Sequence, residues 1–193
     1  MPPSVRQRGR RLPRCFIAAL PDRAGRDWLA ELAEGLLPLW PEAPLDWVEP
    51  ADLHLTLRFL GDLAPEHLLA AIASLAIEEG TPALSLTFRG IELWPARRPR
   101  LVVARLDGDP RLELWLARLG DWAMQQGLRF EPGEHLPHVT LVRSPRPLPV
   151  PARLPRAEGR IGFDRVVAMH RNLAARRPRY EGHAEYRLGA AAS

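Results

Sequence analysis

The sequence predicts a mixed α+β fold, in which antiparallel strands and amphipathic helices share one core. Strand-like alternation of apolar residues recurs in several short segments, and stripes with helical spacing separate these segments. Neither a G-x-G-x-x-G nor a G-x-x-x-x-G-K fingerprint occurs, which argues against a nucleotide-binding parallel sheet. With 193 residues, we expect a flexible basic tail over residues 1–13 and a single domain over residues 14–193.

The chain begins with a strand, a helix and two further strands. Residues 14–20 form a short apolar run that Pro21 ends. The next segment carries apolar residues at spacings of one, three and four, which is typical of an amphipathic helix, and this helix should end near Pro38. Residues 45–48 and 53–60 are then expected to be strands.

The middle of the chain repeats this alternation of elements. Pro65 suits the first turn of a helix, and Gly80 supplies a stop. Residues 83–94 and 101–106 alternate between apolar and polar, which predicts a hairpin. The turn of this hairpin is basic and carries Arg97, Arg98 and Arg100.

The last third of the chain opens with a helix whose apolar face is followed by Gly127. Residues 137–143 form the next expected strand. The five prolines of residues 144–155 predict an extended connection, because proline donates no backbone hydrogen bond. Strands over 161–169 and 183–188 complete the prediction.

Composition limits the classes of partner and compartment. All 27 basic residues are arginine and the net charge is +4, which is compatible with a phosphorylated or nucleic-acid partner and equally with genome composition. Cys15 is the only cysteine, so a disulfide scaffold is excluded. The longest apolar runs are too short for a membrane span or a signal peptide, and we therefore expect a cytoplasmic protein.

One motif occurs twice. His54-Leu55-Thr56-Leu57 is followed 84 residues later by His138-Val139-Thr140-Leu141. Successive side chains of a strand point to opposite faces, so each histidine shares a face with its threonine, and the apolar residues share the other face. The two strands therefore predict one cleft that contains two histidines.

Paired acid and base catalysis fits these two motifs better than metal or covalent chemistry. A metal site would need further ligands, and the candidates His135, Glu134 and Cys15 do not form a ligand-spacing motif. No G-x-S-x-G nucleophile elbow occurs. Imidazole has a pKa near ~6.5, so one ring can accept a proton while the other donates one, and threonine hydroxyls can bind phosphate oxygens.

From Arg14 to Leu188 the sequence resembles the two-histidine phosphoesterases, and within them the RNA 2′,3′-cyclic phosphodiesterases, also called 2′-5′ RNA ligases. The stretches that carry the resemblance are residues 15–21, 47–61, 94–101 and 136–143, and Tyr180. The resemblance implies a bilobal fold with pseudo-two-fold symmetry, in which two antiparallel sheets with outer helices surround a central groove.

The resemblance also implies an activity. Members hydrolyse 2′,3′-cyclic phosphate ends of RNA, such as those of tRNA fragments, to 2′-phosphates without a metal or cofactor, and they can run a reverse 2′-5′ ligation. By this analogy His54 is the acid at the leaving 3′ oxygen and His138 is the base for water, although the symmetry of the motifs leaves this order open. Thr56 and Thr140 would bind the phosphate. We expect a monomer.

Several further residues are candidates for RNA contacts. Arg58 shares the strand face of His54, so it is expected at the cleft or at a solvated strand end. Phe59 is in phase with the apolar face and is expected in the core, with base stacking as the alternative. The remaining candidates are the hairpin residues Arg97 and Arg98, and Arg143 after the second motif.

Two positions depart from the family pattern. Leu136 stands where an arginine often precedes the second motif, and Arg143 would compensate for it. Asn172 stands where relatives often have serine. Two alternative functions stay open: a non-catalytic protein that binds RNA ends or nucleotides, and a phosphodiesterase for a small cyclic-phosphate nucleotide.

Overall fold

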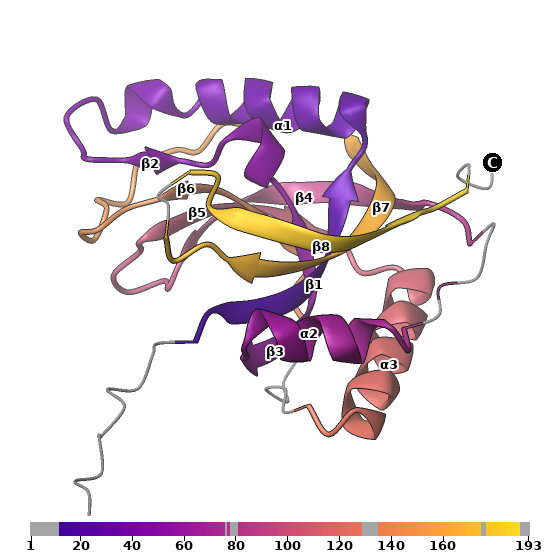
Figure 1. Cartoon of the computed structure of the whole chain (residues 1–193). Coiled ribbons are helices and arrows are strands. Elements are labelled where there is room, and N and C mark those ends of the chain that lie inside the picture. Colours follow the sequence, from indigo (N-terminus) through magenta and orange to yellow (C-terminus); the bar gives the residue numbers. More distant parts are fainter. Residues whose placement is uncertain (1–11, 76, 78–80, 129–134, 175–176, 190–193) are drawn as a thin grey trace, which may run out of the picture.

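The computed structural model describes residues 12–75, 77, 81–128, 135–174 and 177–189, and these contain eight strands and three α-helices (Figure 1). The strands are β1 Arg14–Pro21, β2 Asp46–Trp47, β3 Leu55–Asp62, β4 Leu84–Trp94, β5 Leu101–Leu106, β6 His138–Arg143, β7 Arg160–Arg171 and β8 Tyr180–Arg187. The helices are α1 Arg23–Glu34, α2 Pro65–Ile72 and α3 Pro110–Gln125, with short 3₁₀ turns at Leu37–Leu39 and Pro50–Asp52. The predicted α+β class is confirmed, and each predicted strand and helix is present.

The strands form one continuous sheet in the order β1-β3-β6-β5-β4-β7-β8, with β2 on β6 and a further pairing of β1 with β7. This corrects the expectation of two separate sheets. The reason is the length of β7, because its start pairs with β4 and the rest pairs with β1 on one side and β8 on the other. The sheet therefore has two wings that share β7: one contains β4, β5 and β6, and the other contains β1, β3 and β8. All of these pairings are antiparallel.

The two wings meet again where β3 pairs with β6, through Leu55 and Val139. These are the residues between histidine and threonine in the two motifs. In an antiparallel register, the neighbours of a pair also lie opposite one another, so Thr56 lies opposite His138 and His54 lies opposite Thr140. The pairing thus places the two motifs side by side, related by an approximate two-fold axis.

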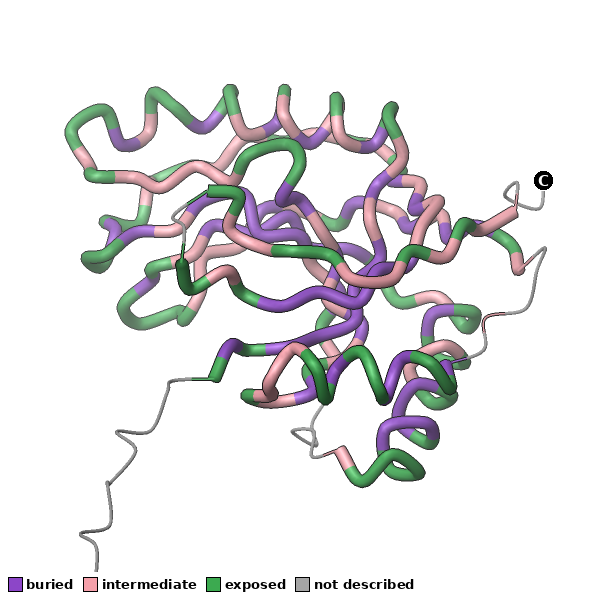
Figure 2. The backbone as a smooth tube through the Cα atoms, viewed as in Figure 1, coloured by how far each residue is buried: buried purple, intermediate pink, exposed green. Residues whose placement is uncertain are grey.

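The helices lie outside the sheet. In Figure 1, α1 lies on one side of the strands, and α2 and α3 lie on the opposite side. Helix α1 contacts β7, β1 and β6, α3 contacts β3, and α2 contacts β7 and β8. Figure 2 shows that the buried residues run along the strands and along one face of each helix. None of the helices in the described part of the chain is long and apolar enough to cross a bilayer.

Local hydrogen bonds decide where two helices begin and end. The Asp22 carboxylate accepts the Gly25 backbone N–H at 2.7 Å and caps α1. Helix α2 ends at Ile72, well before Gly80, which lies outside the described residues. Just beyond this end, the Ser74 hydroxyl donates to the Ala71 carbonyl at 2.8 Å, a local bond that competes with continued helix.

The predicted basic tail over residues 1–13 lies almost entirely outside the described residues. Its last residue, Pro13, accepts a hydrogen bond from the Leu63 backbone N–H at 3.1 Å. Leu12 lines the cavity that contains the two histidines. Leu12 and Pro13 therefore pack against the domain.

Candidate active site

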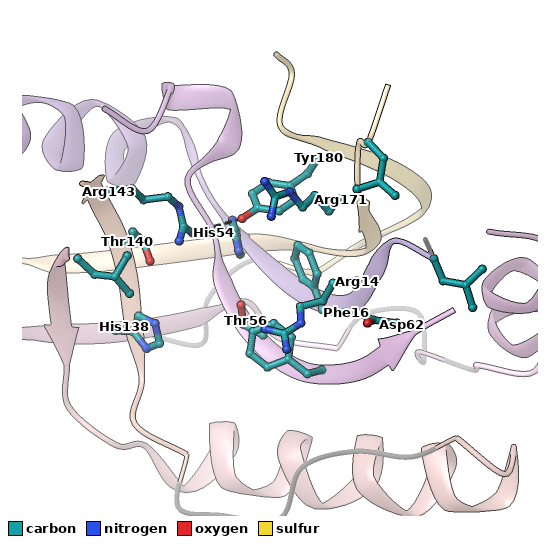
Figure 3. A pocket seen from close by; sticks show the side chains of 14 residues that line it. Arg14, Phe16, His54, Thr56, Asp62, His138, Thr140, Arg143, Arg171 and Tyr180 are labelled. Atoms are coloured by element: carbon teal, nitrogen blue, oxygen red, sulfur yellow. Dashed lines mark hydrogen bonds between the residues drawn. The ribbon is translucent and has the colours of Figure 1, made fainter. Parts of the chain in front are cut away.

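A cavity of about 590 Å³ opens where β1, β3, β6 and β8 come together, and it contains both histidine motifs (Figure 3). The lining side chains come from strands far apart in the sequence. They include His54, Thr56, His138, Thr140, Arg14, Phe16, Phe59, Asp62, Arg143, Arg171 and Tyr180. The polar faces predicted from strand alternation thus open into one cavity, while Leu55, Leu57, Val139 and Leu141 are buried in the core.

The two histidine rings are held in the same way. His54 Nδ1 lies 2.7 Å from the Asp52 carbonyl oxygen, and His138 Nδ1 lies 2.8 Å from the Leu136 carbonyl oxygen. A carbonyl oxygen only accepts, so in each ring the proton is on Nδ1. The Nε2 lone pair of each neutral ring is then available for proton transfer.

His54 lies in an aromatic environment. The Phe16 ring stacks against it at 5.1 Å between centroids, and the Tyr180 ring meets it edge-on at 5.0 Å. Burial lowers the pKa of His54 from 6.5 to about 4. The hydrogen bond to Asp52 opposes this change, while the charges of Arg143 and His138 reinforce it. The ring is therefore neutral at physiological pH in the free protein.

His138 lies against Trp94, with the ring centroids 4.5 Å apart. Burial lowers the pKa of His138, and the hydrogen bond to the Leu136 carbonyl opposes this effect. The nearby groups His135, Arg105 and Arg143 lower it further. The environment of His138 therefore also favours the neutral ring.

The cavity has donors suited to an anion. Thr140 is buried and Thr56 is half-buried, and both hydroxyls can donate to an oxygen in the cavity. Arg143 Nη2 donates to the Tyr180 hydroxyl at 3.3 Å, as Figure 3 shows. Arg143 Nε is buried and has no hydrogen-bond partner among the described residues. Because buried donors are almost always satisfied, this N–H is a candidate donor to a bound ligand.

Two bulges in β3 change which side chains reach the cavity. The register with β1 shifts twice, so that Phe59 pairs with Phe16 and Arg58 pairs with Ile17. Phe59 therefore joins the face of Phe16, lies 6.0 Å from its ring and is 39% exposed, which makes the core interpretation of Phe59 wrong. Arg58 is on the opposite face, where its Nη2 donates to the Leu116 carbonyl of α3 at 2.6 Å. The prediction that Arg58 lies at the cleft is corrected accordingly.

The predicted RNA contacts of the β4–β5 turn lie outside the cavity. Arg97, Arg98 and Arg100 are exposed in the turn between β4 and β5 and do not line the cavity. A contact between this turn and RNA stays a prediction. Leu136 is exposed, and Asn172 uses its side-chain oxygen to accept the Ala174 backbone N–H at 3.0 Å.

The metal-ligand candidates do not gather in the described residues. Cys15 is buried, and burial raises the pKa of its thiol to about 11. Glu134 lies outside the described residues. His135 Nε2 donates to the Thr56 carbonyl at 2.7 Å and so connects the loop before the second motif to the backbone of the first. The described residues contain no group of three or more histidine, cysteine or acidic side chains arranged to hold a metal ion.

Asp52 is a site residue that sequence reasoning missed. Its backbone carbonyl accepts the His54 ring N–H, and its carboxylate accepts the Arg179 backbone N–H at 3.2 Å. Arg179 precedes Tyr180, whose ring packs on His54. Asp52 is only 5% exposed, so it fixes β8 against the first motif from inside the protein. Its position two residues before the histidine was the only sequence feature that pointed to it.

Replacing Asp52 by alanine should lower the free energy of unfolding by about 1–3 kcal/mol, because the part-buried Arg179 N–H loses its acceptor. Asp52→Asn keeps an acceptor oxygen and should lose less than half as much. Urea denaturation of both variants measures the difference. Equal losses for alanine and asparagine would contradict this role of the side-chain oxygen.

Comparison with known proteins shows what part of this site is similar to. Residues 20–104, which include the first histidine motif, match the family model described as LigT-like phosphoesterase. A comparison with curated proteins gives no significant sequence match. The second motif lies outside the matched range, so its assignment rests on the structure.

Solved structures with the same fold extend the match to nearly the whole chain. E. coli LigT complexed with 3′-AMP has a TM-score of 0.67 at 24% identity, over 92% of this chain and 98% of LigT. E. coli LigT in its apo form has a TM-score of 0.66 at 25% identity, over 93% and 99% of the two chains. The protein TT0787 of Thermus thermophilus has a TM-score of 0.66 at 25% identity, over 92% and 98%. The resemblance predicted from the two histidine motifs is thus confirmed: the chain has the LigT fold, and its residues 20–104 match the LigT-like phosphoesterase family model.

Proposed function

We propose that this protein hydrolyses 2′,3′-cyclic phosphate ends of RNA to 2′-phosphates, with His54 and His138 as a general acid and base pair. The observation that carries the proposal is the common cavity, in which two carbonyl-tethered imidazoles lie beside two threonines and Arg143. The match to a phosphoesterase family supports the reaction class. The same site would run the reverse 2′-5′ joining reaction.

The proposed reaction is an in-line displacement at phosphorus. His138 Nε2 takes a proton from water, and the water oxygen attacks the phosphorus. The bond between phosphorus and the 3′ oxygen breaks, and this oxygen leaves with the electron pair and takes a proton from His54 Nε2. The products are a 2′-phosphate and a 3′-hydroxyl, and exchange with solvent restores the two protonation states.

In the proposed scheme, substrate binding supplies the charge that loads the acid. In the free protein, burial keeps His54 neutral, because its pKa is lowered to about 4. A cyclic phosphate brings one negative charge, and an opposite charge nearby favours the protonated ring. Binding of the cyclic phosphate is therefore expected to be accompanied by proton uptake from solvent.

The remaining cavity residues suit the substrate. Thr56, Thr140 and the Arg143 guanidinium are donors for the phosphate oxygens, where charge increases in the transition state. Phe59 and Phe16 form an aromatic wall, and the Arg14 guanidinium lies 5.3 Å from the Phe59 ring centroid. The Phe59 ring is 39% exposed and can stack with a nucleobase of any identity. We therefore propose a nucleotide substrate, in agreement with the 3′-AMP complex of E. coli LigT.

The direct test is hydrolysis of a nucleoside 2′,3′-cyclic phosphate and of an RNA oligonucleotide with a cyclic phosphate end, both with EDTA present. We expect release of the 2′-phosphate and a bell-shaped dependence of kcat/KM on pH, because one ring must be protonated and the other neutral. Turnover of the mononucleotide alone would favour a small-nucleotide phosphodiesterase. Tight, salt-sensitive RNA binding without product would favour a non-catalytic binder and contradict the proposal.

A further inference from the structure

His138 is surrounded by a network that reaches it from β4 and β5, and neither histidine motif includes this network. We propose that Arg105, held in place by Glu92, is a positioning residue that fixes both the backbone and the ring of His138. This inference rests on the proposed function, because it assigns the network to one of the two proton-transfer groups of that reaction.

Arg105 lies on β5 directly opposite His138 of β6, and it is only 6% exposed. Its Nη1 donates to the Pro137 carbonyl at 2.7 Å, and its Nε donates to the Glu92 carboxylate at 3.2 Å. The Pro137 carbonyl belongs to the peptide bond that leads into His138. The guanidinium therefore fixes the main chain at the point where the catalytic candidate begins.

The same carboxylate also fixes the aromatic ring against which His138 packs. One oxygen of Glu92 accepts from Arg105, and the other accepts the indole N–H of Trp94 at 2.8 Å. The Arg105 guanidinium lies 5.7 Å from the Trp94 ring centroid, and the indole lies 4.5 Å from the His138 ring. Glu92 thus holds both the Arg105 guanidinium and the Trp94 indole in place. The indole in turn limits the orientation of the His138 ring.

The two motifs are not equivalent in this respect. His54 packs between Phe16 and Tyr180, and its support comes from Asp52. A buried cation needs a partner, since an isolated one carries a large desolvation cost. The buried Arg105 therefore needs the Glu92 carboxylate as its partner, and the geometry assigns this pair to the positioning of His138.

The network also has an electrostatic effect with a defined sign. The charged and titratable groups near His138 are Arg105, Arg143, His135 and His54, and Glu92 partly neutralises Arg105. Loss of the Arg105 charge should raise the pKa of His138. Loss of the Glu92 charge leaves the Arg105 guanidinium uncompensated and should lower the pKa of His138. If the pair had a purely structural role, removing one charge or the other would not shift the pKa of His138 in opposite directions.

The test uses the full chain and three variants. Arg105→Met removes the charge and keeps the length, Glu92→Gln removes the carboxylate charge, and Arg105→Lys keeps a cation but loses the fork that bonds to two partners. The pKa of His138 is measured by NMR titration of its ring, and kcat/KM is measured against pH. Arg160→Met is the matched control, because this exposed arginine of β7 bonds to Ser85 and Thr87 at the start of β4 and does not line the cavity that contains His138.

We expect Arg105→Met to raise the pKa of His138, to move the limb of the pH profile that reports His138 to higher pH, and to lower kcat by about 10-fold or more. Glu92→Gln should move the same pKa and the same limb downward. Arg105→Lys should leave the pKa near that of the wild type and still lower kcat, while Arg160→Met should change neither.

An unchanged His138 pKa in both charge variants, or shifts in the same direction, would overturn the inference. Glu92 is partly exposed, so Glu92→Gln decides the matter even where Arg105→Met fails to fold. The titration needs no substrate. A wild-type protein without cyclic phosphodiesterase activity would therefore refute the proposed function, while the titration would still report whether the network controls His138.

Discussion

Replacing His54 or His138 by alanine is expected to lower kcat for a 2′,3′-cyclic phosphate by about 10²–10⁴-fold, the usual contribution of a positioned acid or base. The KM should change much less, because Thr56, Thr140 and Arg143, the proposed donors to the phosphate, remain in place. Steady-state kinetics with EDTA present measures both constants. Because the two rings act on one proton-transfer sequence, the double variant should lose less than the product of the two single losses.

His67→Ala is the control for these substitutions. His67 is exposed on α2 and does not line the cavity, so the variant should keep wild-type kinetics. Thermal unfolding of all variants separates lost chemistry from lost structure. Wild-type turnover in either His54→Ala or His138→Ala would refute paired acid and base catalysis.

The free protein should lose stability in acid because of His54. Its pKa is about 4 in the folded protein and 6.5 when unperturbed. Between these values the unfolded chain binds a proton that the folded protein does not bind, so stability falls as the pH falls. Above pH 6.5 this contribution is fully present, and by pH 4 about 3 kcal/mol of it should be lost.

His54→Gln isolates this contribution, because glutamine does not titrate. Urea denaturation at pH 7 and at pH 4 gives the loss of unfolding free energy for each protein. The wild type should lose about 3 kcal/mol more than the variant, since the other titrating groups are common to both. An equal loss in the two proteins would mean that His54 has the same pKa in the folded and the unfolded chain, and this would contradict the buried neutral ring.

The order of strands and helices was predicted almost completely from local pattern. The expected strand over 101–106 has the observed bounds, and the proline-rich residues 144–155 contain no strand or helix. Periodicity is a local property of the chain, and it reports how a segment alternates between core and surface. The end of α2 was predicted less well, because a side-chain bond of Ser74 stops the helix before its glycine.

The candidate site was predicted only in part. Alternation alone placed His54 with Thr56, and His138 with Thr140, on polar faces, and these faces do open into one cavity. Alternation failed just beyond the first motif, at Phe59. The bulges of β3 depend on its pairing with β1, and a residue inserted in a strand reverses the face of every side chain that follows.

By itself, the sequence determined the repeated motif, its division into a polar and an apolar face, and the family to which these residues point. Only the tertiary structure decided that β3 pairs with β6 through Leu55 and Val139, and that β7 joins both wings of the sheet. It also decided that Arg105, bonded to Glu92, lies opposite His138 on the neighbouring strand. The physical reason is that side-chain periodicity is fixed by neighbours in the chain. Strand pairing, bulges and ion pairs join residues that are distant in sequence, and their free energy exists only in the folded protein.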